Sequence, residues 1–253
     1  MKKTTALCIA LASTALMNAS AQAEVLYQEN SVRVGYQTLL DAEDKNANRY
    51  DQGYLAYYHT TLADWGSALG WLWLENPLDN ADNQQGDDAG ATTKGWLKID
   101  YALGDTPFNL WLQSFFMGNT TCMEQNLYFG GSYSIRADNL NGTFGLGANY
   151  SYGSFRPANS SFNGANGYAA VVALAYNLTP SLVARGYYEA QFDRDDEFQT
   201  ALGYDQFGYQ VQLGVDYHIN SRLMLSSSYM YLDSWGATKR DGGEMLFELG
   251  VKF

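Results

Sequence analysis

The chain has 253 residues, of which 17% are charged and 15% aromatic, and it contains 25 Gly but only 4 Pro. A mean hydropathy of −0.30 excludes a helical membrane protein, which needs apolar runs of ~20 residues. The aromatic content excludes a disordered chain, and the length suits one closed all-β domain.

Residues 1–23 have the pattern of a secretory signal peptide. A basic start with two lysines precedes the apolar stretch Ala6–Met17, and Ala21-Gln22-Ala23 places small residues around a cleavage site. The apolar stretch is short and no stop-transfer pattern follows it, which makes a membrane anchor the weaker interpretation. We therefore expect cleavage after Ala23 and a single mature domain over residues 24–253.

The expected mature chain is strongly acidic. Loss of the two leader lysines reduces the 15 basic residues to 13, against 27 acidic residues, which gives a net charge of −14. Nucleic-acid binding is not expected, because phosphate contacts need a basic face. Cys122 becomes the only cysteine, so no intramolecular disulfide can form. No basic residue flanks it to activate the thiol, and we interpret it as an unreactive loop residue.

Alternation with a period of two dominates the chain from Ser31 onward. In Phe207–Ile219 one face carries Phe, Tyr, Val, Leu and Ile, and the other carries Gly, Gln, Asp and His. Phe144–Tyr152 and Met245–Phe253 repeat the pattern, and no helical period survives across these stretches. The pattern predicts about twelve strands, near 31–40, 49–61, 67–75, 94–103, 108–117, 124–135, 142–152, 167–178, 182–192, 206–219, 223–233 and 244–253.

The connections between these strands alternate in length. Short ones are expected at 62–66, 104–107, 136–141, 179–181 and 220–222, and mostly long, polar ones at 41–48, 76–93, 118–123, 153–166, 193–205 and 234–243. Tight turns on one side of the membrane and longer loops on the other are typical of outer-membrane barrels. All the prolines fall in connections, where no ladder N–H is lost: Pro77, Pro107, Pro157 and Pro180.

A soluble β-sandwich also alternates, so the direction of the apolar face decides the fold. Tyrosines such as Tyr209 and Tyr217 bracket the apolar faces, and eight residues at ~3.4 Å each, tilted ~40°, span roughly 21 Å, close to the ~25 Å lipid band. Gly, Ser, Gln and Asn on the opposite faces suit a lumen, and closure leaves no strand edge in lipid. We therefore predict an all-β fold, a transmembrane antiparallel up-and-down β-barrel of the bacterial outer membrane.

Short motifs are concentrated on the second and third predicted strands. Tyr54-Leu55 and Tyr57 precede Asp64-Trp65 and Gly70-Trp71, in the order Y-L-x-Y, D-W and G-aromatic. Asn166-Gly167-Tyr168 opens the eighth strand, and Gly250-Val251-Lys252-Phe253 ends the chain. These motifs resemble those of the nucleoside-specific channel-forming (Tsx-like) family. The resemblance implies a monomeric twelve-stranded channel, set in outer-membrane lipid and lipopolysaccharide, that takes up nucleosides or similar small solutes. It implies no individual ligand-contacting residue.

In a pore the working residues face inward, and the predicted register assigns them. The candidates for lining the pore and contacting solute are aromatic, amide and charged residues: Trp96, Lys98, Asp100, Asn109, Trp111, Gln113, Phe115, Arg185, Tyr187, Glu189, Gln210, Gln212, Glu244 and Glu248. Arg33, Gln37, Gln191, Asp216 and Lys252 are also assigned to inward faces. A register error of one residue would turn any of these strands inside out.

Two interpretations of the interior aromatic residues remain open. Trp96, Trp111, Phe115 and Tyr187 offer flat faces on which a planar base can stack, which is worth ~1–3 kcal/mol per base in nucleic-acid sites. Amides and carboxylates beside them would bind the edge of the base and the ribose, as weak multi-site binding requires. Alternatively, the rings fill and stiffen a narrow barrel while the charges pair across its wall.

The sixth to eighth strands differ, because their inward residues are small. These residues are Gly130, Ser132, Ser134, Gly145, Gly147, Ala169, Val171, Ala173 and Ala175. We expect an inward-folded loop or the bulky opposite wall to fill this space and to leave an off-centre, slot-like passage.

No cofactor and no metal are expected. The acidic segments Asp193–Glu197 and Asp79–Asp88 lack the regular ligand spacing of a cation site, and we interpret them as solvated loops. The net charge predicts a mild preference for cations at the mouth of the pore.

Two functions of other classes compete with the channel. Outer-membrane hydrolases are barrels of similar size, but they need a general base, and the mature chain has only His59 and His218, both predicted near short turns at the periplasmic end. A pore-less adhesin or receptor would use the loops and show no conductance. The sequence therefore predicts a non-enzymatic channel for passive diffusion of small solutes, selective for nucleosides, with a general porin as the alternative.

Overall fold

The computed structural model describes residues 24–46, 49–78 and 90–253. The expected signal peptide and the acidic segment at 79–88 lie outside the described residues, so the structure does not test what the sequence predicts for them.

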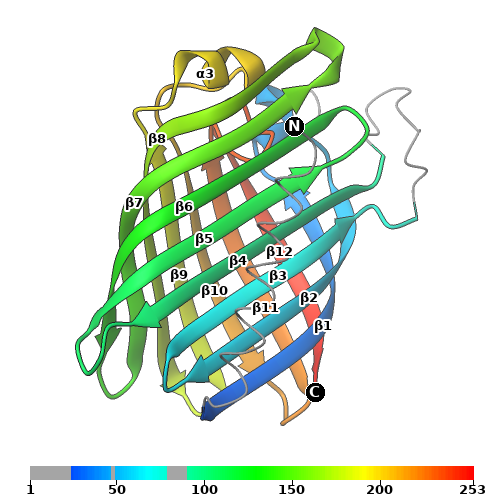
Figure 1. Ribbon diagram of the computed structural model, residues 1–253. Helices are drawn as coiled ribbons and strands as arrows, with labels where there is room; N and C mark the ends of the chain where they lie inside the picture. Colours follow the sequence, from blue (N-terminus) through cyan, green and yellow to red (C-terminus); the bar gives the residue numbers. More distant parts are fainter. Residues whose placement is uncertain (1–23, 47–48, 79–89) are drawn as a thin grey trace.

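Twelve strands within the described residues form one closed antiparallel sheet, as predicted. Each strand pairs with its neighbours in sequence, and β1 pairs with β12, so no edge strand is left. The strands tilt steeply around the barrel (Figure 1). Their bounds are β1 Val25–Leu39, β2 Gln52–Ala63, β3 Gly66–Glu75, β4 Thr92–Ala102, β5 Phe108–Gly118, β6 Cys122–Arg136, β7 Leu140–Phe155, β8 Ser160–Thr179, β9 Leu182–Phe192, β10 Gly208–His218, β11 Leu223–Asp233 and β12 Gly242–Lys252.

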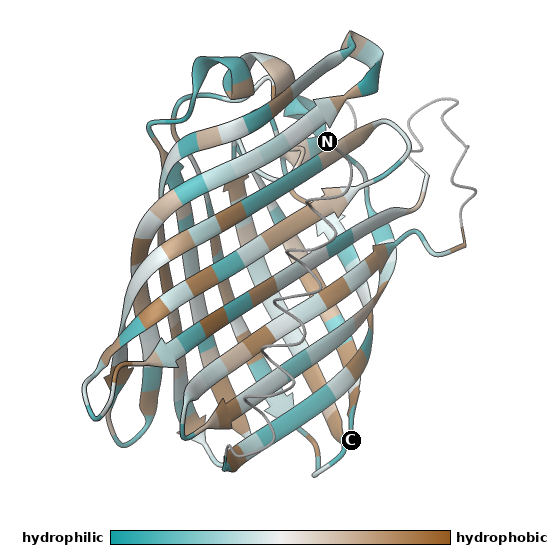
Figure 2. Ribbon diagram, in the orientation of Figure 1, coloured by the Kyte–Doolittle hydropathy of each residue, from teal (hydrophilic) through white to brown (hydrophobic). Residues whose placement is uncertain are grey.

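The alternation of side chains sets an apolar exterior against a polar interior. Outward-facing Val34, Phe129 and Leu213 are 60%, 65% and 57% exposed, whereas inward-facing Gln37 and Lys98 are 1% exposed. Apolar and polar positions alternate along the strands (Figure 2). A soluble protein buries its apolar face, so this distribution requires hydrocarbon around the barrel. A strand of 11 residues such as β4 rises roughly 29 Å at a tilt of ~40°, which is enough to cross the ~25 Å apolar band.

The two ends of the barrel differ in their connections. At one end, turns at 64–65, 103–107, 137–139, 180–181 and 219–222 join the strands, as predicted. The opposite end carries α2 Ala42–Lys45, η1 Arg156–Ala158 and α3 Asp196–Leu202 (Figure 1). No helix in the described part of the chain is long and apolar enough to cross a membrane.

The predicted connection at 193–205 joins β9 to β10, but it is not a solvated loop throughout, because α3 occupies residues 196–202. The helix has local signals at both ends. The Asp195 carboxylate accepts a hydrogen bond from the Glu197 backbone N–H at 2.8 Å, and Gly203 ends the helix with a φ of 71°. Phe198, Ala201 and Leu202 are buried, so packing against the barrel holds this short helix.

Two other predicted loops are wrong in extent. Most of the predicted loop 153–166 extends β7 and β8, since Tyr150–Phe155 pairs with Ser160–Ala165. This hairpin projects beyond the neighbouring strands (Figure 1). Its Gly, Ser and Asn residues have low strand propensity, but cross-strand pairing satisfies their backbone groups. The predicted loop 118–123 contracts to 119–121, and β1 begins at Val25 rather than at Ser31.

Two loops at the long-loop end are fastened to each other by exposed carboxylates. Asp41 Oδ1 accepts a hydrogen bond from the Gly243 backbone N–H at 2.6 Å, and Lys45 Nζ donates to Asp241 Oδ2 at 2.7 Å. The Gly243 N–H lowers the pKa of Asp41, and the Lys45 ammonium lowers the pKa of Asp241. A carboxyl group whose pKa is lower in the folded state than in the unfolded state stabilises the folded contact at pH values above its unfolded-state pKa. This stabilisation is lost as the pH falls through the folded-state pKa.

We therefore expect the Gly243 amide to lose protection from hydrogen exchange below about pH 4, the unfolded value for aspartate. The measurement is amide exchange at pH 7 and pH 3, corrected for the intrinsic rate and referred to amides in the middle of β12. Asp41→Asn retains the acceptor oxygen but does not titrate, so its protection at Gly243 should not change between the two pH values. Equal protection of Gly243 at both pH values in the natural chain would contradict the expectation.

Candidate functional site

The barrel interior is the candidate site, and the structure places every sequence-predicted candidate on its inward face. Those that are buried are Lys98, Asp100, Asn109, Trp111, Gln113, Phe115, Glu189, Glu244 and Glu248. Those that are half-buried, and so keep accessible surface within the barrel, are Trp96, Arg185, Tyr187, Gln210 and Gln212. Arg33, Gln37, Gln191 and Asp216 are buried on the same faces, and Lys252 is half-buried.

Four inward-facing aromatic residues lie side by side across β2–β5, and we call them the aromatic row: Tyr58, Trp71, Trp96 and Phe115. The register pairs Tyr58 with Trp71, Trp71 with Trp96, and Trp96 with Phe115. The row runs across tilted strands, so it climbs from the short-turn half of the barrel towards the long-loop end. Trp71 and Trp96 are half-buried, which leaves ring surface facing the interior.

Sequence reasoning missed Tyr58 and Trp71 as members of the interior wall. Residues 54–58 and 71–74 are aromatic or apolar on both faces, so the contrast that identified the polar faces of other strands is absent there. The signal that was available is register. Once β3 pairs with β4, Trp71 lies directly opposite the inward-facing Trp96.

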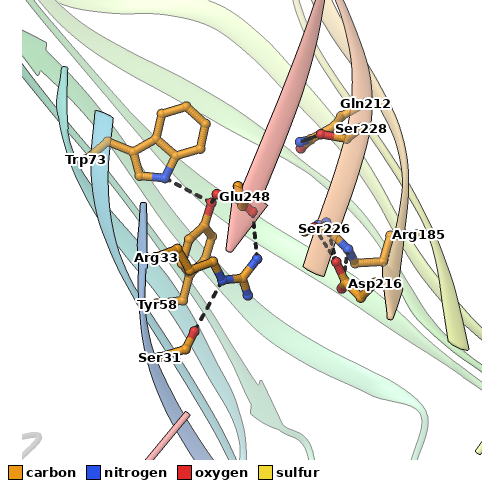
Figure 3. A network of polar contacts seen from close by, with 10 residues as sticks. All are labelled: Ser31, Arg33, Tyr58, Trp73, Arg185, Gln212, Asp216, Ser226, Ser228 and Glu248. Atoms are coloured by element: carbon orange, nitrogen blue, oxygen red, sulfur yellow. Dashed lines mark hydrogen bonds and ion pairs between the residues drawn. The ribbon is translucent and has the colours of Figure 1, made fainter. Parts of the chain in front are cut away.

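One end of the aromatic row is joined to a buried ion pair (Figure 3). Glu248 accepts hydrogen bonds from Arg33 Nη1 at 2.8 Å and from the Tyr58 hydroxyl at 2.7 Å. Trp73 Nε1 donates to the Tyr58 oxygen at 3.1 Å, and the Arg33 guanidinium carbon lies 3.8 Å from the centroid of the Tyr58 ring. These contacts hold the Tyr58 ring in one orientation.

A second polar group lies on β9–β11 (Figure 3). Arg185 contacts both carboxylate oxygens of Asp216, with Nη2 to Oδ1 at 2.9 Å and Nε to Oδ2 at 2.6 Å. Ser226 Oγ also accepts from Arg185 at 3.0 Å, and Gln212 Nε2 donates to Ser228 Oγ at 2.9 Å. The Arg185 side chain is 31% exposed, so this group keeps donors accessible inside the barrel.

Other interior charges are paired in the same way. Lys98 is bonded to Asp100, which also accepts from Ser132 Oγ at 2.6 Å. Glu244 accepts hydrogen bonds from Arg49 and from Gln37 Nε2. Lys94 Nζ lies 2.6 Å from Glu75 Oε1. Each of these cations has its own carboxylate, so their charges cancel along the interior wall.

Side chains also meet across the barrel, between strands that are not neighbours. Gln113 on β5 donates to the Tyr187 hydroxyl on β9 at 3.2 Å, and the Trp96 and Tyr187 rings lie edge to face at 5.9 Å. Gln191 on β9 donates to the Tyr128 hydroxyl on β6 at 2.7 Å. These contacts bridge the interior from β4–β6 to β9. The large inward side chains that keep accessible surface include Trp71 and Trp96 on β3 and β4 and Arg185, Gln210 and Gln212 on β9 and β10. The passage therefore runs past these two groups of side chains.

The histidines lie near the short-turn end, as the sequence indicates, and point to different faces. His59 on β2 contacts Asn30 Oδ1 through Nδ1 and Thr61 Oγ1 through Nε2, both at 2.8 Å, in the outward-facing register. His218 on the inward face lies 3.3 Å from Lys252 Nζ.

The remaining predicted features have structural roles. In the acidic segment, the Asp195 carboxylate accepts a hydrogen bond from a backbone N–H in the first turn of α3. The Asp196 carboxylate accepts one from the side-chain amide of Gln199 in the same helix. Among the described residues, no group of three or more His, Cys, Asp or Glu is arranged to hold a metal ion. Cys122 opens β6 and packs against the buried cluster around Phe198.

Comparisons with known proteins agree with this geometry. Residues 36–253 match a family model described as nucleoside-specific channel-forming protein, Tsx. A sequence comparison with curated proteins finds no significant match. Among solved structures, the NanC porin is similar with a TM-score of 0.55 at 11% identity, over 88% of this chain and 98% of that chain. An outer-membrane channel from Pseudomonas putida F1 is similar with a TM-score of 0.51 at 10% identity, over 89% of this chain and 95% of that chain. At such identities the likeness shows the barrel fold alone.

Proposed function

Because the chain belongs to the family of nucleoside-specific channel-forming proteins (Tsx), we propose that a nucleoside crosses its barrel with the base against the aromatic row and the ribose against the polar groups of β9–β11. The protein is a nucleoside-selective channel of the outer membrane. The observation that carries the proposal is the position of Trp71 and Trp96, which keep ring surface opposite the accessible Gln210, Gln212 and Arg185.

The two walls of the passage fit the two halves of a nucleoside. A planar base gains ~1–3 kcal/mol by stacking on an aromatic ring, and this gain does not depend on which base it is. A ribose offers hydroxyl groups that can donate to Gln212 and accept from Arg185. Several weak contacts in series favour entry without holding the solute, as conduction requires.

The pairing of the interior charges supports a neutral solute. Arg185 is held by Asp216, Arg33 by Glu248 and Lys98 by Asp100, so these cations do not offer the unpaired positive charge that a phosphate group needs. A neutral molecule with many hydrogen-bonding groups suits such a wall.

We also propose that residues 1–23 are removed and that the barrel over 24–253 works as a monomer in lipid and lipopolysaccharide. Closure within one chain supports the monomer, because no strand edge needs a partner. The mass of the purified protein in detergent, corrected for bound detergent, tests it, and a multiple of the chain mass would contradict it.

We further infer that transport involves no catalysis. The chain of contacts Asn30–His59–Thr61 has a hydroxyl next to a base, but it faces outward, away from the passage. The N–H groups of these strands are committed to the β1–β2 ladder, so they do not provide the donors that would stabilise an oxyanion. Hydrolysis of a phospholipid ester by the solubilised protein, lost in His59→Asn, would contradict this inference.

Liposome swelling tests the proposed function. Uridine is compared with N-acetylglucosamine and with an amino acid of similar size in liposomes that contain the purified protein. We expect uridine to enter about fivefold faster or more, which corresponds to a stacking gain of ~1 kcal/mol. Equal entry rates for the three solutes would show that the protein is a general diffusion pore. Swelling no faster than in protein-free liposomes would contradict a channel.

A further inference from the structure

The inward face of β6–β8 is built from small residues, and a side chain from outside the strands covers it. Trp235 is 2% exposed and packs in one buried cluster with Trp111, Tyr128, Ala169 and Val171. Trp235 belongs to the loop 234–241, which joins β11 to β12 at the long-loop end. The space in front of the small residues is therefore occupied partly by an inward-folded loop.

The loop presents Trp235 in a tight turn. Trp235 and Thr238 each donate a backbone hydrogen bond to the other at 2.8 Å. Ser234 and Ala237 have φ values of 49° and 68°, in the left-handed region that costs ~1 kcal/mol or more for residues other than glycine. Such a conformation persists only when the surroundings hold it, and two other segments do so here.

Arg194, directly after β9, holds the turn from one side. Its Nη1 donates to the Ser234 carbonyl at 2.8 Å and to the Asp205 carbonyl at 3.3 Å, and its Nε donates to Gln191 Oε1 at 2.8 Å. The guanidinium carbon lies 5.8 Å from the centroid of the Trp235 ring, and the Arg194 side chain is 2% exposed. Arg194 thus joins the wall of β9 to the backbone that carries the tryptophan.

Two further contacts fix the same loop. The Tyr204 oxygen accepts from the Ala237 backbone N–H at 2.8 Å, while its hydroxyl donates to Glu124 on β6 at 2.7 Å. Asn46, after α2, accepts from the backbone N–H groups of Lys239 and Arg240 at 2.9 and 3.0 Å. The loop is therefore anchored to strands and loops on both of its sides, which is the arrangement of a fixed element rather than a swinging flap.

Trp235 also contacts one end of the aromatic row. Its ring lies 6.4 Å, between centroids, from Phe115, the last member of the aromatic row. We propose that Trp235 is a built-in plug that closes the β6–β8 side of the lumen near the long-loop end, and that Arg194 positions it. The plug sets the width of the passage and hence the size of solute that enters. This inference depends on the proposed function in one respect, that solutes pass through the barrel, and it does not depend on nucleoside selectivity.

The test measures pore size with uncharged sugars, so that it does not depend on nucleoside recognition. Liposomes with the natural chain or with Trp235→Ala are compared for the rate of disaccharide entry relative to monosaccharide entry. We expect this ratio to rise severalfold in Trp235→Ala and single-channel conductance to increase, while Trp235→Phe stays near the natural values. Arg240→Ala, an exposed position on the same loop, is the matched control and should change neither quantity.

Heat-modifiable migration in electrophoresis confirms that each variant is a folded barrel before it is assayed. If Trp235→Ala does not fold, Arg194→Ala takes its place and should raise the same ratio. An unchanged sugar ratio in the folded variant overturns the plug. Uridine preference over size-matched sugar is measured in parallel on the natural chain, and its absence would count against the proposed function and not against the plug.

Discussion

Trp96→Ala is expected to reduce the preference of the channel for nucleosides by about fivefold, which corresponds to ~1 kcal/mol of lost binding. Trp96 sits at the centre of the aromatic row, paired in register with Trp71 and Phe115, and its half-buried ring faces the passage. Loss of one stacking surface costs ~1–3 kcal/mol per base in comparable sites. The measurement is the ratio of uridine to N-acetylglucosamine entry into liposomes.

The controls separate recognition from general loosening of the barrel. Trp96→Phe keeps a flat ring and should retain most of the preference. Trp65→Ala removes an indole from the turn at 64–65, away from the aromatic row, and should leave the ratio unchanged. A Trp96→Ala channel that still prefers uridine as strongly as the natural chain would show that the rings only fill the barrel.

Asp100→Asn is expected to destabilise the barrel by about 3–5 kcal/mol, the usual cost of leaving a buried charge without its partner. Lys98 and Asp100 are 1% and 2% exposed, so water does not replace the lost carboxylate. The Ser132 hydroxyl, which donates to Asp100 at 2.6 Å, cannot compensate the ammonium charge. Urea unfolding of the barrel in phospholipid, followed by tryptophan fluorescence, measures the free energy of unfolding.

The double variant Lys98→Met, Asp100→Asn removes both charges and should recover most of the lost stability, because a buried pair can be replaced by neutral groups at little cost. Lys45→Ala breaks only the exposed contacts with Asp41 and Asp241 and should leave the urea midpoint close to that of the natural chain. If Asp100→Asn unfolds at the same urea concentration as the natural chain, the interior around Lys98 is wetter than the contacts indicate.

The strands could be predicted from the sequence because a barrel wall has a strict period of two. The predicted strands 182–192 and 223–233 match β9 and β11 at both ends. On these strands polar inward residues such as Arg185, Glu189 and Ser226 alternate with apolar outward residues such as Tyr188 and Leu225. The small residues of β6–β8 likewise indicated a space that had to be filled, and the structure places Trp111 and Trp235 there.

The outer end of the barrel could not be predicted, because its order comes from contacts distant in sequence. Arg194 is buried only because the Ser234 and Asp205 carbonyls come to it from other parts of the chain. The polar composition of 193–205 and 234–241 predicts loops. These segments have no alternation of polar and apolar residues that would identify Trp235 as inward-facing. The extended β7–β8 hairpin was hidden for a similar reason, since pairing overrides the low strand propensity of its residues.

Planar-bilayer recording with added solute tests the central claim most directly. If the base of a nucleoside lies against the aromatic row while it crosses, uridine must occupy the passage and reduce the ion current in a saturable, concentration-dependent manner. N-acetylglucosamine at the same concentration should reduce the current much less, and Trp96→Ala should weaken the uridine effect. An ion current that uridine and the sugar reduce equally, or that neither reduces, would contradict the account.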